Sequence, residues 1–333
     1  MDLLRICAAF MVVLLHVAAD QWTELSCYSP DWFVSHVYNS CVRSAVPLFV
    51  MISGMFLLNP NKELTWSMLW HKYCKRILVI FVVWSAAYAF AYYAVWPMLQ
   101  GKPIAWGKVW HEFWEGNYHL WYCKMLLGLY LLMPFLKKIT ADKGLTEYFL
   151  ILCAMFTVVV PVLPFEAVDA FMTDTFFYFT LGFTGYFVLG YYLKTVTLSG
   201  KVQAVIYLAG LGGLLFTIFG SAAKAYAVGV PYGYFDPQLL NVVCMTIAIF
   251  IFFQYHGGRF ANRFHKAVNT VSGCTLGVYL LHPLLMVIFE KIGFYVMMCP
   301  LVLSIPIVTI VIFTVSLCIT WCIKKLPFLR ALV

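Results

Sequence analysis

The chain has 333 residues, of which 63% are hydrophobic and only 11% are charged. A soluble domain has about 45–50% apolar and about 25% charged residues, so a soluble chain of this composition could not hide its apolar side chains from water. The same figures exclude a disordered chain, a disulfide framework and a collagen-like repeat. The composition therefore predicts a polytopic membrane protein.

Ten stretches are apolar enough to cross the hydrocarbon layer, which takes about 20 residues per helix. They lie near residues 3–19, 37–58, 77–96, 119–136, 146–165, 176–193, 202–222, 238–255, 268–289 and 300–323. The first has the length of a signal peptide, but its interior contains His16, so we predict that it is a retained helix. We expect an all-α bundle of about ten transmembrane helices that forms one domain over residues 1–333.

The basic residues are distributed unevenly between the two sides of this bundle. With the N-terminus placed inside, 16 of the 22 Lys and Arg but only 4 of the 14 Asp and Glu fall on the cytoplasmic side. This distribution follows the positive-inside rule, so the net charge of +8 reflects topology and does not predict a nucleic-acid partner. We expect a multi-pass protein of a bacterial inner or plasma membrane, surrounded by lipid, with both termini in the cytoplasm.

The 11 cysteines lie mostly within apolar runs and form no CxxC pair. A buried cysteine behaves as a small apolar side chain. We therefore predict no metal site.

Two ionisable residues share one face of the first helix. Arg5 and His16 are eleven positions apart, which corresponds to about 20° of rotation and roughly 16 Å of rise. Asp2 lies one turn before Arg5, and Asp20 lies one turn after His16. A lone buried histidine is usually structural, but ionisable groups inside membrane spans are costly and mark functional sites, so we favour a functional role for this stripe.

The second span is unusually polar and contains Arg43, Pro47, Ser53 and Gly54. Proline removes a backbone donor and glycine permits close approach, so we predict a helix that is broken or kinked around a cavity. Close packing through small residues is the alternative, although it does not explain the cost of burying Arg43.

Further charged residues lie at two depths. His119, Trp121 and Lys124 open the fourth span, and His282 lies in the outer half of the ninth. At the cytoplasmic mouth, Arg5 is joined by three more basic residues, Lys72, Lys75 and Arg76. Two polar centres at different depths suggest a reaction that takes one reactant from each side of the membrane, although the positive-inside rule alone would also explain Lys72 to Arg76.

Between the third and fourth spans, Trp106, Trp110 and Trp114 recur at every fourth position. This spacing predicts an amphipathic helix at the membrane interface. An aromatic belt is the favoured explanation for the tryptophans, and a platform for stacking sugar rings is the alternative.

These residues together resemble the integral-membrane acyltransferase 3 family. The shared features are Asp2-x-x-Arg5, Arg5-x10-His16, the segment from Val46 to Gly54, the basic Lys72-Lys75-Arg76 segment, His119-Leu120-Trp121-Tyr122 with Tyr130 and Pro134, and the segment from Leu276 to Pro283. The resemblance implies transfer of an acyl group, commonly acetyl, from cytoplasmic acyl-CoA to a hydroxyl of a surface glycan or a lipid-linked precursor. It also implies that Arg5 and His16 form the family's catalytic pair. Lys124 departs from the pattern, since an uncharged residue is expected there.

The residues suit this chemistry. A thioester is already activated, so the enzyme needs chiefly a base for the acceptor hydroxyl, and we expect His16 in that role with Asp20 orienting its ring. We expect acyl-CoA, a co-substrate and not a bound cofactor, to contact Arg5, Lys72, Lys75, Arg76 and Ser53. The candidates for binding the acceptor or the oxyanion are Arg43, His119, Trp121, Lys124 and His282.

Two other classes of protein use similar features. A transporter or flippase also has broken helices and charges near the midplane, but it predicts a symmetric pattern in the two halves, which we do not find. A membrane sensor or binding module predicts a fused effector domain. We favour the acyltransferase.

Overall fold

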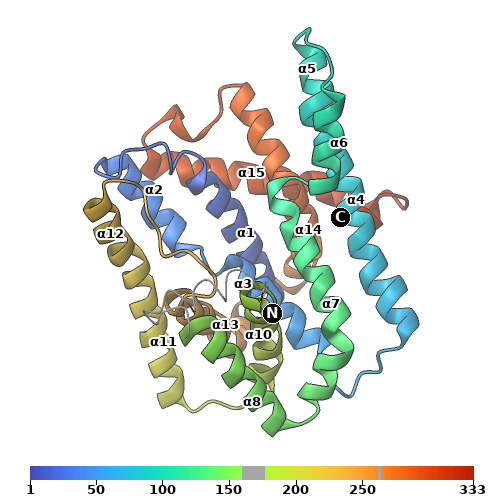
Figure 1. Cartoon of the computed structure of the whole chain (residues 1–333), viewed down its shortest axis with the longest axis vertical. Helices are drawn as coiled ribbons and strands as arrows, with labels where there is room; N and C mark the ends of the chain where they lie inside the picture. Colours follow the sequence, from blue (N-terminus) through green and yellow to red (C-terminus); the bar gives the residue numbers. More distant parts are fainter. Residues whose placement is uncertain (160–176, 262–263) are drawn as a thin grey trace.

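The computed structural model describes residues 1–159, 177–261 and 264–333, and this part of the chain is a bundle of helices (Figure 1). The helices are α1 (Asp2–Ala19), α2 (Pro30–Cys41), α3 (Ala45–Leu57), α4 (Lys75–Phe90), α5 (Trp96–Leu99), α6 (Trp106–Glu115), α7 (Trp121–Thr140), α8 (Lys143–Ala154), α10 (Phe177–Thr195), α11 (Gly200–Leu215), α12 (Ser221–Val228), α13 (Leu240–Ala261), α14 (His265–Lys291) and α15 (Leu301–Lys324). Short π-helical segments adjoin several of them, namely η1 (Met68–Cys74), η2 (Ala91–Val95), η4 (Met155–Val159) and η6 (Phe216–Gly220), and a 3₁₀ turn, η3 (Tyr118–Leu120), precedes α7.

Eight helical stretches within the described residues are long and apolar enough to cross a membrane. They coincide with eight of the ten predicted spans, which confirms a polytopic helical membrane protein. The fifth and sixth predicted spans fall on α8 with η4 and on α10. Residues 160–176, which include the end of the fifth predicted span, lie outside the described residues, so the number ten stays a prediction.

Helix α1 lies at the centre of the bundle and packs against α2, α3, α13, α14 and α15. Leu4, Ala8, Val13 and Val17 on this helix are fully buried. Because α1 is surrounded by other helices, the ionisable residues on its remaining face look into the protein and not into lipid.

The second predicted span is broken, as its sequence indicates. Helix α2 ends at Cys41 and α3 begins at Ala45, so the break covers residues 42–44 and contains Arg43. Pro47 lies inside the first turn of α3, where a backbone N–H would have no partner within the helix. The break therefore falls before the proline and not at it.

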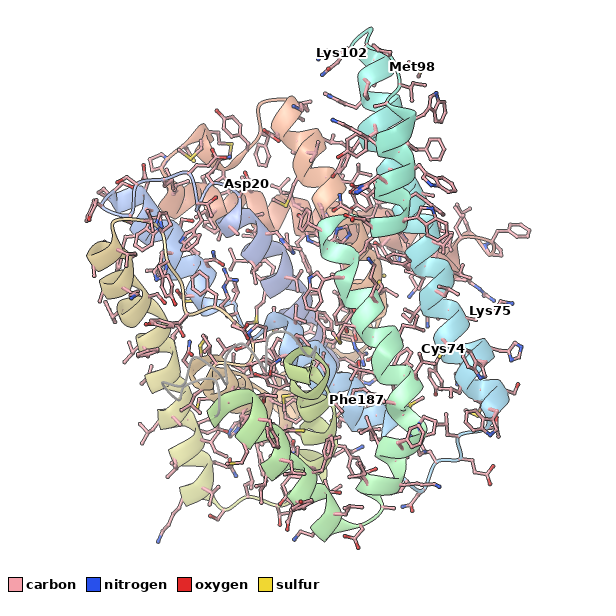
Figure 2. All side chains as sticks on the ribbon, in the orientation of Figure 1. Asp20, Cys74, Lys75, Met98, Lys102 and Phe187 are labelled. Atoms are coloured by element: carbon pink, nitrogen blue, oxygen red, sulfur yellow. The ribbon has the colours of Figure 1, made fainter. Side chains whose placement is uncertain are left out.

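Helices α3 and α10 are in direct backbone contact. A Cβ atom added to Gly54 would lie 1.7 Å from the carbonyl oxygen of Phe187, and one added to Gly190 would lie 2.0 Å from that of Met51. Such contacts are typical of membrane helices, which associate through small residues. Phe187 accordingly lies deep in the bundle (Figure 2).

Gly54→Ala is therefore expected to lower the stability of the bundle, because the methyl group can be placed only by separating α3 from α10. Overpacking of this kind costs about 1–3 kcal/mol. The thermal unfolding midpoint of the purified protein in detergent measures the change. Gly212→Ala in α11 is the matched control, since a Cβ atom there meets no neighbour within 4 Å. Equal midpoints for Gly54→Ala and the unmodified protein would contradict the expectation.

A hairpin, formed by α4, η2 and α5 on one side and α6 on the other, projects from the bundle (Figure 1). We call it the outer hairpin, after the side of the membrane on which the sequence predicts it. Met98 and Lys102 lie at its tip (Figure 2). The predicted amphipathic helix is α6, in which Val109 is buried while Trp106, Trp110 and Trp114 are each more than 60% exposed.

Candidate active site

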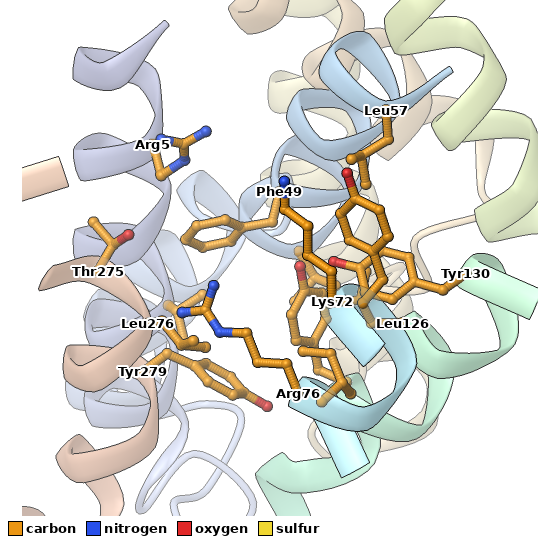
Figure 3. Close-up of a pocket in the computed structure, with 15 residues that line it drawn as sticks. Arg5, Phe49, Leu57, Lys72, Arg76, Leu126, Tyr130, Thr275, Leu276 and Tyr279 are labelled. Carbon is orange, nitrogen blue, oxygen red and sulfur yellow. The ribbon is translucent and has the colours of Figure 1, made fainter. Parts of the chain in front are cut away.

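A cavity of about 260 Å³ opens between α1, α3, η1, α4, α7 and α14. Three cationic side chains line it, Arg5 from α1, Lys72 from η1 and Arg76 from α4. Figure 3 shows their charged ends pointing into the same space. None of the residues recorded as lining this cavity is acidic. We call it the inner cavity, and its charge suits an anionic ligand.

Arg5 is held in place by two neighbours. Its guanidinium lies 3.1 Å from the Asp2 carboxylate and donates to the Ser272 hydroxyl on α14 at 3.2 Å. That hydroxyl in turn donates to Asp2 at 2.9 Å. Asp2 is on the predicted stripe, whereas Ser272 is distant in sequence and nothing in the sequence singled it out. These three contacts among Arg5, Asp2 and Ser272 hold the Arg5 guanidinium at the edge of the inner cavity.

Two aromatic rings line the inner cavity close to each other. They belong to Tyr122 and Tyr279, and their centroids are 5.4 Å apart. Val12, one helical turn or about 6 Å before His16, lines the same cavity. At this end the inner cavity comes within one helical turn of the predicted catalytic histidine, which is not itself among the lining residues.

Three histidines meet beyond this end. The ring centroids of His16 and His282 are 5.1 Å apart, and those of His119 and His282 are 5.8 Å apart. They come from α1, η3 and α14, so three segments distant in sequence converge on one point. His119 and His282 are almost completely buried. We call this group the histidine cluster; Tyr279 joins it to the inner cavity, with centroids 5.5 Å from His119 and 6.1 Å from His282.

Hydrogen bonds fix the tautomers of two of these rings. The Nδ1 atom of His282 lies 3.2 Å from the Val278 carbonyl oxygen, and that of His119 lies 2.9 Å from Asn117 Oδ1. Both oxygens only accept, so each Nδ1 carries the hydrogen and each Nε2 keeps its lone pair. The Nε2 atom of His282 is buried and has no hydrogen-bond partner among the described residues, whereas the His119 ring also faces the Leu280 backbone. A buried acceptor without a donor indicates that a hydroxyl or water belongs here.

The hydroxyl of Tyr88 from α4 bridges two backbone groups of α14 beside His282. It donates to the Leu280 carbonyl at 2.7 Å and accepts from the Leu284 amide at 3.2 Å. These bonds lie at the turn where Pro283 removes a backbone donor. The Tyr88 ring also lies 4.9 Å from that of His119. Tyr88 is a positioning residue that the sequence did not reveal.

Other predicted site residues lie outside this arrangement. Asp20 is at the outer end of α1, and no hydrogen bond joins it to His16 within the described part of the chain. Lys75 is exposed and does not line the inner cavity (Figure 2). Its neighbour Arg76 does line this cavity. Ser53 donates to the Phe49 carbonyl at 2.9 Å and is likewise not among the lining residues.

Arg43 and Lys124 have their own partners. The Arg43 guanidinium lies 3.7 Å from the centre of the Phe235 ring and bonds to Asn39. The Lys124 ammonium donates at 2.5 Å to the Glu115 carbonyl, which stabilises the C-terminus of α6.

Trp121 lies with Lys124 on a separate cavity beside α10. Of the residues predicted to bind the acceptor or the oxyanion, the structure therefore brings the rings of His119 and His282 together with His16, and Arg43 is close enough to act on His16 through its charge. In the residues that the structure describes, no group of three or more His, Cys, Asp or Glu side chains could hold a metal ion.

Fold and site together define a multi-pass membrane protein in which a cationic cavity and a cluster of three histidines share Tyr279 as a neighbour. The family model described as an acyltransferase domain matches residues 1–323. The chain belongs to the acyltransferase 3 family and is a membrane acyltransferase, as the sequence motifs indicated. No curated protein and no solved structure matches the chain.

Proposed function

We propose that the protein transfers an acyl group, acetyl in the first instance, from cytoplasmic acyl-CoA to a hydroxyl of a surface glycan or its lipid-linked precursor. The observation that carries this proposal is the position of Tyr279, which lines the inner cavity and also lies beside His119 and His282. An anionic thioester donor would be held in the inner cavity, and its acyl group would reach the imidazoles beside Tyr279.

The inner cavity suits the donor in charge and shape. Arginine binds phosphate through paired N–H groups, so Arg5 and Arg76 would contact the phosphates of CoA, with Lys72 as a further charge. At about 260 Å³ the cavity is smaller than CoA, so the nucleotide would stay at the mouth. The extended pantetheine arm would pass Tyr122 and Tyr279 toward His16.

The histidine cluster would then perform the transfer. His16 accepts the proton of the acceptor hydroxyl while that oxygen attacks the thioester carbonyl carbon. The carbon–sulfur bond breaks as the tetrahedral intermediate collapses, and the CoA thiolate takes up the proton. Packing of the His282 ring, whose centroid lies 5.1 Å from that of His16, would orient the His16 ring, a role that the sequence suggested for Asp20.

The direct test is incubation of the purified protein with ¹⁴C-acetyl-CoA and a panel of neutral, amino and acidic glycosides. We expect labelled acetyl esters that hydroxylamine releases. The His16→Gln protein is the control for uncatalysed transfer. Absence of ester with every acceptor, in a folded protein that binds acetyl-CoA, would refute the proposal.

The proposed direction of transfer requires both termini and the inner cavity to face the cytoplasm. Reporter fusions at Lys138 and Val333 are therefore expected to give cytoplasmic signals, and a fusion at Lys102 an external one. Alkaline phosphatase and green fluorescent protein, which are active on opposite sides of the membrane, provide the two measurements. A cytoplasmic signal at Lys102 would overturn the orientation.

A further inference from the structure

A second cavity, of about 140 Å³, lies at the opposite end of the histidine cluster. We call it the outer cavity. Its polar lining residues are Asp20 from α1, Tyr92 from η2, Tyr118 from η3 and Glu290 from α14, with Tyr295 at its edge. The residues recorded as lining it include no Lys, Arg or His. The two cavities therefore have opposite charge, three cations in the inner one and two carboxylates in the outer one.

The outer cavity reaches the histidine cluster through Tyr118. The ring of Tyr118 lies 5.2 Å from that of His16 and 5.6 Å from that of His119. Pro283, which also lines the outer cavity, directly follows His282. The Nε2 atom of His282, in a side chain that is 0% exposed, has no hydrogen-bond partner among the described residues, and its residue directly precedes the lining Pro283. This atom lacks a hydrogen donor, which a hydroxyl at this end of the outer cavity would supply.

The carboxylates of Asp20 and Glu290 both line the outer cavity. Partial burial raises the pKa of Asp20, and repulsion from Glu290 adds to this rise. Carboxylates accept hydrogen bonds from sugar hydroxyls, and they attract ammonium groups and repel other anions. The rings of Tyr92 and Tyr118 offer apolar faces beside them. This combination suits a hydroxyl-rich ring that bears no negative charge.

We propose that the outer cavity binds the acyl acceptor, and that Asp20 and Glu290 select neutral sugars and amino sugars over acidic ones. This inference rests on the proposed function. The physical reason is the contrast in charge, because an acceptor with a carboxylate or phosphate near the reacting hydroxyl would enter a space that already holds two carboxylates. The same contrast keeps the phosphates of CoA on the inner side.

The test compares three glycosides that differ in one substituent, methyl glucoside, methyl glucosaminide and methyl glucuronide, with the full chain in nanodiscs and ¹⁴C-acetyl-CoA. We expect kcat/KM for the two non-acidic acceptors to exceed that for the glucuronide by at least about tenfold. In the isosteric double variant Asp20→Asn, Glu290→Gln this ratio is expected to fall toward one, chiefly through a gain for the glucuronide. The KM for acetyl-CoA should stay unchanged, which also shows that the variant is folded.

Glu115→Gln is the matched control, because Glu115 is an exposed acid of the outer hairpin that does not line the outer cavity. It should leave the acceptor ratio unchanged. Equal kcat/KM for all three glycosides, or the same ratio in the double variant as in the unmodified protein, would overturn the acceptor site and leave acyl transfer intact. Absence of transfer to every acceptor in the unmodified protein would instead refute the proposed function, and this inference with it.

Discussion

His16→Gln is expected to lower the rate of acyl transfer by a factor on the order of 10² to 10⁴, the usual contribution of a general base. Glutamine keeps most of the size and hydrogen-bonding capacity of histidine, but it cannot accept a proton at neutral pH. The protein should therefore fold, bind acetyl-CoA and fail in transfer. Initial rates of labelled ester formation at saturating donor and acceptor measure the effect.

The His16 experiment has a matched control in His111→Gln, since His111 lies on the exposed α6 and outside the histidine cluster. It should retain full activity. A structural histidine at position 16 would give the reverse pattern, in which glutamine restores activity and alanine lowers the yield of protein. A folded His16→Gln variant with near-normal rates would contradict the assignment and direct attention to His282.

Arg76→Ala is expected to raise the KM for acyl-CoA by roughly tenfold or more, because losing one charge-assisted contact costs about 1.5–3 kcal/mol. The KM for the acceptor should not change, since Arg76 lines only the inner cavity. The increase should grow smaller at high ionic strength, where charge contributes less. Steady-state kinetics with varied acetyl-CoA at low and high salt measure both effects.

Lys75→Ala provides a close comparison for Arg76→Ala. The two residues are adjacent, basic and exposed, but only Arg76 lines the inner cavity. Its removal should leave the KM for acyl-CoA near its original value. If both variants changed this KM equally, general positive charge on the cytoplasmic side would explain the effect, and the specific donor contact would be refuted.

The sequence was most informative along a single helix. An α-helix has 3.6 residues per turn and a fixed rise per residue. The sequence alone therefore predicted that Arg5 and His16 lie on one face of α1, and it also predicted the distance between them. Hydropathy likewise gave the depths of His119 and His282. Their convergence with His16 depends on how α1, α7 and α14 are rotated against one another, which depth alone does not determine.

Because depth does not determine how the helices are rotated, other residues predicted at a similar depth lie away from the histidine cluster. Lys124 was expected near the reaction because it lies in the outer half of its span. The turn at Gly116, with a φ angle of 75°, places the end of α6 above α7, and Lys124 bonds to the Glu115 carbonyl there. Ser272 and Tyr88 act through hydroxyl groups on otherwise ordinary helices, so their sequence context gave no signal.

Helix α4 and its extension η2 contribute residues to both cavities and to the surroundings of the histidine cluster. Arg76 lines the inner cavity, and Tyr88 contacts His119 and bonds to α14 beside His282. Tyr92 lines the outer cavity, about 24 Å from Arg76 along the axis. If helix α4 moved when acyl-CoA binds, the position of Tyr92 in the outer cavity would change as well. Coupling between two ligands is reciprocal, so the acceptor must change the affinity for acyl-CoA by the same factor. We therefore expect interdependent binding and direct transfer within a ternary complex.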